Sequence, residues 1–277
     1  MIFDLLNYGF IRNALMAATL TSIACGMIGT YIVSRRLVFI SGGISHTSFG
    51  GIGIAYFLGI HPLIGAAVFS VLAAFGIEFL AGRSKVRIDS AIAILWSFGM
   101  AVGIIFVYIT PGYAPNLMSY LFGSILTVSL TEILAMLTVT SLLILFYIFF
   151  YRVLLYSSFD EEFARSRGLS VNIVKYVSLA FISLVIVMSI RVAGVILVIS
   201  LLTIPQAAIN LFYRNFRQII LGAVLFAMAG SIGGLVISYW LNIPSGASII
   251  FLLVILFIMA RLLSMLRERR KQENILR

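Results

Sequence analysis

Apolar residues along this chain come in long runs that short polar stretches separate. Nine runs are close to the length of about 20 residues that a helix needs to cross a bilayer. They occupy residues 13–33, 38–58, 62–81, 90–110, 130–151, 174–190, 192–213, 219–241 and 247–266. A shorter apolar segment, 119–127, is expected to form a re-entrant or interfacial helix on the outer side. The pattern predicts an all-α, polytopic transmembrane helical bundle, with residues 1–277 forming a single transmembrane domain.

Composition supports a membrane protein and excludes a soluble domain. Hydrophobic residues make up 62% of the 277 positions and charged residues 10%, against roughly 45–50% and about 25% in soluble domains. The sequence contains no Gly-x-x-x-x-Gly-Lys-Ser/Thr phosphate loop, so ATP binding of that type is not expected. The single cysteine, Cys25, rules out an internal disulfide or a cysteine metal cluster. No removable signal peptide is expected.

The basic residues predict how the chain is oriented. With nine spans and the N-terminus outside, 17 of the 19 Lys and Arg residues fall on the cytoplasmic side, and only Arg12 and Arg191 fall outside. Basic residues gather on the cytoplasmic side of membrane proteins. The charge pattern therefore predicts N-terminus out and C-terminus in, in the inner (cytoplasmic) membrane. The division of 174–213 into two spans depends on a break at Arg191.

The second span carries an unusual polar stretch, Ser41 to Gly53, with five glycines, three serines, a threonine and a histidine. Glycines let helix backbones approach closely, and hydroxyls can bond between helices. An ionisable group at this depth, His46, is expected to face the bundle or a wet path, and neutral imidazole is a common ligand of transition metals. Two interpretations remain: a packing seam with a hydrogen-bonded His46, or a metal path with His46 as a contact.

The cytoplasmic segment 159–170 has the pattern of a short amphipathic helix. Asp160 and Glu161 suit the positive start of a helix, and Gly168 is a natural end. Phe163 contributes to an apolar face that could dock into a groove of a partner protein. The alternative is a solvated connector whose charges only mark the cytoplasmic side.

The seventh predicted span contains Pro205, which is expected to kink the helix and to free the carbonyl of Leu201. Three polar residues lie three positions apart and so share a face: Ser200, Thr203 and Gln206. The span is either a pathway helix or an ordinary kinked helix with polar packing.

Five stretches, in order, resemble the zinc/manganese/iron permease family of ATP-binding-cassette importers. They are Ile44-Ser45-His46, the short outer segment 119–126, the loop Asp160 to Gly168, the helix Gly194 to Pro205 and the turn Pro244 to Gly246. The similarity covers nearly the whole chain. Each motif is weak alone, and the five in the same order are fairly specific.

The resemblance implies partners and site residues. Permeases of this family pair as two copies, dock on two ATP-binding subunits and receive metal from an extracytoplasmic binding protein. It implies docking through five residues: Asp160, Glu161, Phe163, Ala164 and Gly168. It also implies a metal contact at His46. The family usually has an aspartate four residues before this histidine, and here that position is Gly42.

The resulting hypothesis is a non-catalytic permease that moves a zinc, manganese or iron ion inward, with no cofactor of its own and with ATP hydrolysed by a separate subunit. His46 would contact the ion with help from Ser45, and Ser200, Thr203 and Gln206 would line the path. The alternatives are a permease for a metal chelate or other larger substrate, a stand-alone secondary transporter or channel, and an intramembrane enzyme.

Other residues that could contact a metal receive structural assignments. Glu78 and Glu132 lie near the ends of spans, where a structural role is expected. His61 is expected at the surface of an outer turn, and Cys25 and Met27 in core packing.

Overall fold

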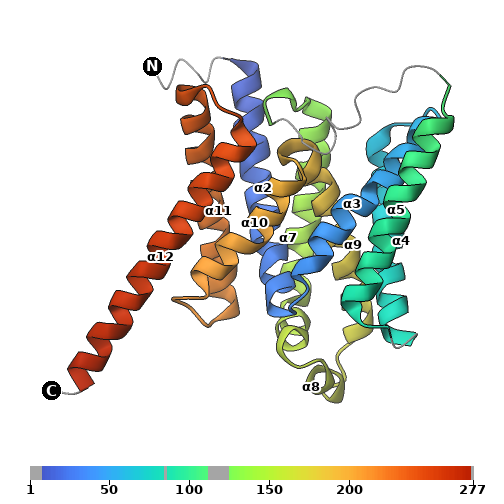
Figure 1. Cartoon of the computed structure of the whole chain (residues 1–277). Coiled ribbons are helices and arrows are strands. Elements are labelled where there is room, and N and C mark those ends of the chain that lie inside the picture. Colours follow the sequence, from blue (N-terminus) through green and yellow to red (C-terminus); the bar gives the residue numbers. More distant parts are fainter. Residues whose placement is uncertain (1–7, 84–85, 112–124, 276–277) are drawn as a thin grey trace.

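The computed structural model describes residues 8–83, 86–111 and 125–275. Every regular element in these ranges is a helix, which agrees with the predicted all-α class (Figure 1). The elements are α2 (Gly9–Ser34), α3 (Val38–Phe57), α4 (Pro62–Arg83), α5 (Ile88–Ile109), the 3-10 helix η1 (Ile125–Thr127), α7 (Leu130–Phe159), α8 (Glu161–Ser166), α9 (Val171–Ala193), α10 (Val195–Ile209), α11 (Phe216–Leu241) and α12 (Ser245–Ile275).

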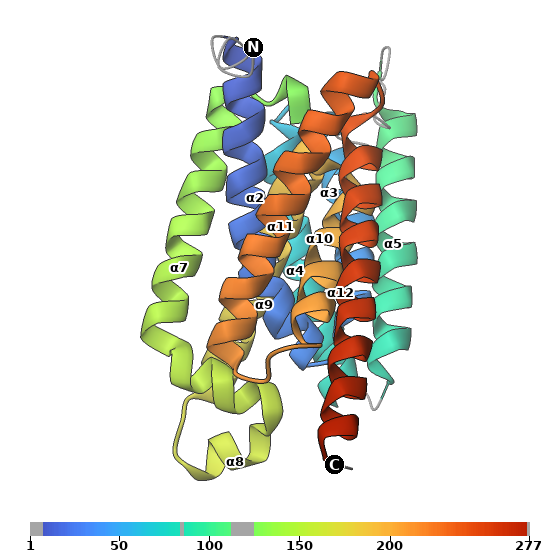
Figure 2. The ribbon, with the colours of Figure 1, turned by 90° about the vertical axis from the view of Figure 1, so that its left-hand side faces the viewer.

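Seven of these helices are long and apolar enough to cross a membrane: α2, α4, α5, α7, α9, α11 and α12. The other two predicted spans correspond to α3 and α10. Helix α3 has 20 residues but carries the polar Ser41–Gly53 stretch, and α10 has only 15 residues. Both lie among the longer helices (Figure 2). The count of nine spans therefore stays a prediction.

Two boundaries differ from the predicted ones. The break between α9 and α10 falls at Gly194, whose φ of 77° ends α9, and Arg191 lies inside α9. The charge of Arg191 does not end the helix because its Nε donates to Glu132 Oε1 at 2.8 Å. Helix α10 ends at Ile209 instead of residue 213. Of the predicted outer segment 119–127, only residues 125–127 lie within the described residues.

Helix α2 forms the centre of the bundle, with its window of highest hydropathy 72% buried. Its residues Cys25, Ile28 and Ile32 are fully buried. It packs against α7, α9, α10 and α11, while α3, α4 and α5 form a neighbouring group (Figure 1). Burial of Cys25 and Met27 agrees with the predicted core packing.

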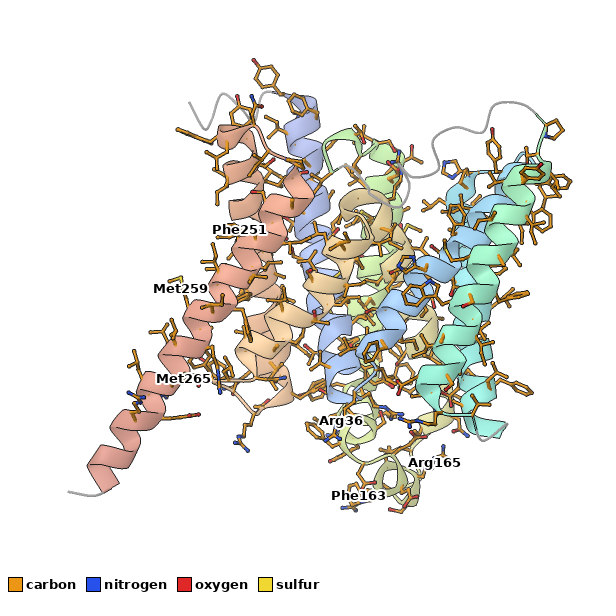
Figure 3. The ribbon with its side chains drawn as sticks, in the orientation of Figure 1. Arg36, Phe163, Arg165, Phe251, Met259 and Met265 are labelled. Atoms are coloured by element: carbon orange, nitrogen blue, oxygen red, sulfur yellow. The ribbon has the colours of Figure 1, made fainter. Side chains whose placement is uncertain are left out.

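The outer surfaces of the helices are apolar, as a lipid-facing surface must be. On α12, Phe251, Met259 and Met265 point away from the bundle (Figure 3). Gly9, where α2 begins, lies at one end of the bundle, whereas α8 and the end of α12 lie at the other (Figures 1 and 2). Arg36 and Arg165, both predicted to be cytoplasmic, lie at the α8 end (Figure 3).

Candidate functional site

Glycines of the polar stretch bring α3 into direct backbone contact with α4 and α5. A Cβ atom on Gly53 would lie 2.5 Å from the Gly103 carbonyl oxygen, and one on Gly50 would lie 2.8 Å from that of Gly99. A Cβ on Gly51 would overlap the carbonyl of Gly65. These glycines therefore serve close helix packing, as in other membrane bundles.

The hydroxyl groups of the same stretch are satisfied within α3. Ser45 is fully buried and donates to the carbonyl oxygen of Ser41 at 2.7 Å. Thr47 donates to Gly43 and Ser48 donates to Ser45, both at 2.6 Å. Ser45 thus lies next to His46 in the chain, and the proton of its hydroxyl is already used in a hydrogen bond within α3.

His46 differs from its neighbours on α3 because it is only half-buried. Its imidazole stacks on the indole of Trp96 on α5, with ring centroids 4.3 Å apart and an interplanar angle of 5°. Within the described part of the chain, no residue forms a hydrogen bond with the imidazole. These residues therefore do not form the packing seam with a hydrogen-bonded His46 that the sequence left open. Sequence reasoning missed Trp96, since nothing in the sequence pairs positions 46 and 96.

Gly42 lies one helical turn before His46 and has room around it. A Cβ atom there would meet only the Cδ1 atom of Ile199, at an ordinary contact distance of 3.7 Å. At the next residue, Gly43, a Cβ would overlap the side chain of Ile92. Position 42 therefore faces α10 without the tight packing that fixes the other glycines.

Helix α10 separates its three predicted polar residues. Gln206 is fully buried, and its Nε2 donates to the α2 carbonyl of Cys25 at 3.0 Å. The same nitrogen lies 3.5 Å from the Leu201 carbonyl that Pro205 leaves free. Ser200 and Thr203 are only partly buried, and each donates to a carbonyl of its own helix. Gln206 thus holds α10 against α2.

The described residues contain no group of three or more His, Cys, Asp or Glu side chains able to hold a metal ion. Glu78 pairs with Lys175, and Glu132 pairs with Arg191. Glu132 also completes a capping box with Ser129 at the start of α7. His61 is exposed and accepts from the backbone N–H of Leu63 at 3.3 Å. These carboxylates have the structural roles expected of them.

Helix α8 is the predicted amphipathic segment, in a shorter form. Asp160 caps it by accepting from the N–H of Phe163 at 2.9 Å, and Gly168 follows it with a φ of 73°. Ala164 is fully buried against the bundle. Phe163 is 41% exposed, and the guanidinium of Arg167 lies over its ring at 5.3 Å. The helix therefore presents an exposed aromatic ring among charged side chains of both signs beyond the bundle (Figure 3).

Glu161 does not share this outward surface. Its carboxylate contacts Arg35 of α2 and Arg165 of α8, each at 2.7 Å, and lies 3.9 Å from Lys175 of α9. Burial alone would raise the pKa of Glu161, but hydrogen bonds from Arg165 and Arg35 and the charge of Lys175 outweigh it and hold the pKa below its ordinary value. We call Arg35, Glu78, Glu161, Arg165 and Lys175 the Glu161 cluster. Sequence reasoning missed Arg35 and Lys175 because their charges only indicated orientation.

Beside the Glu161 cluster is a cavity of about 240 Å³ at the α8 end of the bundle. Tyr31, Arg35, Glu78 and Lys175 form its polar wall, and residues of α3, α4, α5 and α9 form its apolar walls. The cavity therefore lies next to the ion pairs that connect α2, α4 and α9.

Comparison with known proteins gives the family. Residues 7–264 match the ABC 3 transport family. The chain belongs to this family. The match covers nearly all of the chain, and it confirms the importer permease family that the five motifs resemble.

Individual relatives match over similar lengths. An uncharacterised membrane protein of Synechocystis is 40% identical over 92% of this chain and 91% of its own. The manganese transport system membrane protein MntC of Halalkalibacterium halodurans is 34% identical over 93% of this chain and 88% of its own. Among solved structures, PsaBC from Streptococcus pneumoniae, determined with a Fab, has a TM-score of 0.82 and 31% identity over 94% of this chain and 95% of that chain.

Proposed function

We propose that this ABC 3 transport family member is the membrane permease subunit of an ATP-binding-cassette importer that moves a divalent transition metal ion into the cytoplasm. Two similar proteins support the metal: MntC is named for manganese transport, and ScaB of Streptococcus gordonii, 30% identical, is named a manganese import permease. Manganese is therefore the first substrate to test.

The observation that carries this function is the half-buried His46 on α3. A histidine within a membrane bundle costs free energy that an apolar residue would not, and stacking on Trp96 fixes the plane of its ring. The imidazole lone pair suits a passing transition metal ion. A single weak contact also suits transport, because the ion must leave as readily as it arrives.

The other predicted pathway residues divide by their surroundings. Ser200 and Thr203 on α10 and Ser45 on α3 have hydroxyl oxygens able to accept or coordinate while their protons stay bonded within the helix. Gln206 would hold α10 in place beside the pathway, because its amide nitrogen donates a hydrogen bond to the α2 backbone. We keep Ser45, Ser200 and Thr203 as pathway candidates and give Gln206 a positioning role.

The partners follow from the same proposal. One ATP-binding subunit would dock at the α8 of each permease copy, on the surface formed by Asp160, Phe163 and Gly168, and would hydrolyse ATP outside this chain. Ala164, for which docking was also expected, is buried against the bundle and would instead anchor α8. The exposed Phe163 ring supports this docking. A second copy of the permease and an extracytoplasmic metal-binding protein complete the importer, in the cytoplasmic membrane with the N-terminus out and the C-terminus in.

A metal chelate is the second candidate substrate, since the room at Gly42 would suit a larger cargo than a bare ion. A stand-alone ion-coupled transporter receives less support. Such a protein needs an acid in its pathway, whereas Glu78 and Glu132 are held in ion pairs near helix ends.

The deciding experiment is uptake of radioactive Mn²⁺ into vesicles that carry the assembled importer. His46→Ala is expected to insert and assemble but to lose most uptake. His61→Ala is the matched control, because it removes the other histidine from an exposed turn. Normal uptake by His46→Ala at matched protein levels would refute a metal role for this residue, and uptake only of chelated metal would favour the second candidate.

A further inference from the structure

The Glu161 cluster connects α8 with Arg35 at the end of α2, three residues before α3 begins at Val38. We propose that the ion pair between Glu161 and Arg35 is the positioning contact through which movement of α8 reaches α3. The inference rests on the proposed function, because it assigns to α8 the contact with the ATP-binding subunits. Glu161 is then an interior contact behind the docking surface and not a residue of that surface.

Arg35 joins three segments with one side chain. Its Nη2 contacts Glu161 Oε2 at 2.7 Å, and its Nη1 donates to the carbonyl of Ser157 near the end of α7 at 2.6 Å. Arg35 itself is the C-cap of α2. A displacement of α8 relative to α2 must therefore stretch these two contacts or carry Arg35 with it.

The turn after Arg35 is short and specifically shaped. Arg36 has a φ of 57°, a left-handed conformation that a non-glycine residue rarely adopts. The N–H of Leu37 closes the turn on the carbonyl of Ile32 at 2.9 Å, and α3 begins at Val38. Because this turn is short and its conformation is fixed, a movement of Arg35 would displace the start of α3. His46 follows eight residues later, about 12 Å along the helix.

The pair is largely shielded from water, whereas Arg165 beside it is exposed. The side chains of Arg35 and Glu161 are 17% and 23% exposed, whereas that of Arg165 is 52% exposed. Ion pairs withdrawn from water are less screened than surface pairs. On α8, only Ala164 is fully buried, so Glu161 supplies a large share of what holds this helix to α2. Lys175 extends the link to Glu78 on α4.

The test uses the importer assembled with its ATP-binding subunits in proteoliposomes, and it measures Mn²⁺ imported per ATP hydrolysed. Glu161→Gln and Arg35→Gln are each expected to lower this ratio roughly 5- to 10-fold, the usual scale of coupling between sites. The double variant should be no worse than the worse single one. Arg35→Lys, which keeps the charge, should recover part of the ratio. Glu162→Gln is the matched control, since it removes an exposed neighbouring carboxylate.

The possible outcomes distinguish a positioning contact from a docking residue and from a residue without a role in coupling. A normal ratio in Glu161→Gln, or losses that multiply in the double variant, would overturn it. Loss of the ATP-binding subunits from purified Glu161→Gln would also overturn it, by making Glu161 a docking residue. If one Gln variant does not insert, the other decides, because a normal ratio in it refutes the link. If neither inserts, Glu161→Asp decides, because the shorter side chain lengthens the 2.7 Å contact with Arg35 and a normal ratio then refutes the link. Absence of Mn²⁺ import by the unaltered importer would instead refute the proposed function, and the inference with it.

Discussion

The imidazole of His46 on α3 lies parallel to the indole of Trp96 on α5, with centroids 4.3 Å apart and planes 5° apart. The two residues are 50 positions apart in the chain, and α3 and α5 bring them together along a contact lined by glycines. Stacked aromatic pairs contribute about 0.5–1.5 kcal/mol beyond the area they bury. Trp96 therefore limits the orientations of the His46 ring in its proposed contact with an ion.

Replacement of this indole tests that role. Trp96→Ala is expected to lower Mn²⁺ uptake by up to about tenfold, since the lost stacking leaves the imidazole free to rotate. Trp96→Phe should keep most uptake. The control is Trp240→Ala, the other tryptophan, which is 61% exposed on α11. Equal uptake by all three variants would show that stacking does not matter.

Gly42→Asp is expected to be tolerated and to increase metal retention, because it places a carboxylate one turn before His46 with 3.7 Å between its Cβ and Ile199. Transport should slow as the ion leaves less readily. Metal bound to the purified importer after washing is the measurement. Gly43→Asp is the control, and its overlap with Ile92 should prevent normal insertion. Unchanged retention in Gly42→Asp would argue against coordination at His46.

Gln206→Leu is expected to lower the stability of the solubilised protein by about 0.5–1.5 kcal/mol, the net contribution of a typical hydrogen bond. The carbonyl of Cys25 loses its bond from Nε2. Thermal unfolding in detergent measures the effect. Gln218→Leu, an exposed position on α11, should change little. If Gln206→Leu unfolds like the unaltered protein and loses transport, Gln206 contacts the substrate and does not merely hold α10.

The attachment of α8 should depend on pH through Glu161. Its pKa is lowered in the folded protein, so its contribution to stability is present above the ordinary glutamate pKa of about 4.3 and is lost as pH falls through the lower folded value. Arg35, Arg165 and Lys175 face it, and Glu78 competes for Lys175. The protection of residues 161–169 against hydrogen exchange, taken relative to the intrinsic exchange rate at each pH, should therefore stay high at neutral pH and fall in acid.

A matched variant isolates the group responsible for this pH effect. In Glu161→Gln, protection of the same segment should be low already at neutral pH and should lose most of its acid dependence. Glu162→Gln should behave like the unaltered chain. A loss of protection in acid that persists in Glu161→Gln would assign the dependence to another group.

The topology can be tested with single cysteines in a Cys25→Ser background. His61→Cys and Ser166→Cys occupy exposed positions between α3 and α4 and on α8. Nine spans with the N-terminus outside place residue 61 outside and residue 166 inside. An impermeant thiol reagent added to intact cells should label only the former. Labelling of both from the same side would contradict the predicted arrangement.

The sequence alone determined the class of the fold and the positions of most helices. Apolar runs of membrane length have few alternatives to helix, because backbone groups in lipid must be satisfied within the segment. The same reasoning located α8, since Asp160 and Gly168 are local signals for the start and end of a helix. It failed at Arg191, whose charge suggested a break. The pairing of Arg191 with Glu132 depends on a contact between residues 59 positions apart.

Only the tertiary structure decided what surrounds each candidate residue. Spacing placed Ser200, Thr203 and Gln206 on one face of a helix, but the approach of α2 buries Gln206 and leaves the other two partly exposed. The sequence identified His46 and Glu161 as residues of interest without indicating Trp96 or Arg35. Helical periodicity is a local property and fixes which residues share a face. The partner that each face meets depends on how helices distant in sequence pack, and that packing is set by contacts such as those of Gly50 and Gly53 with α5.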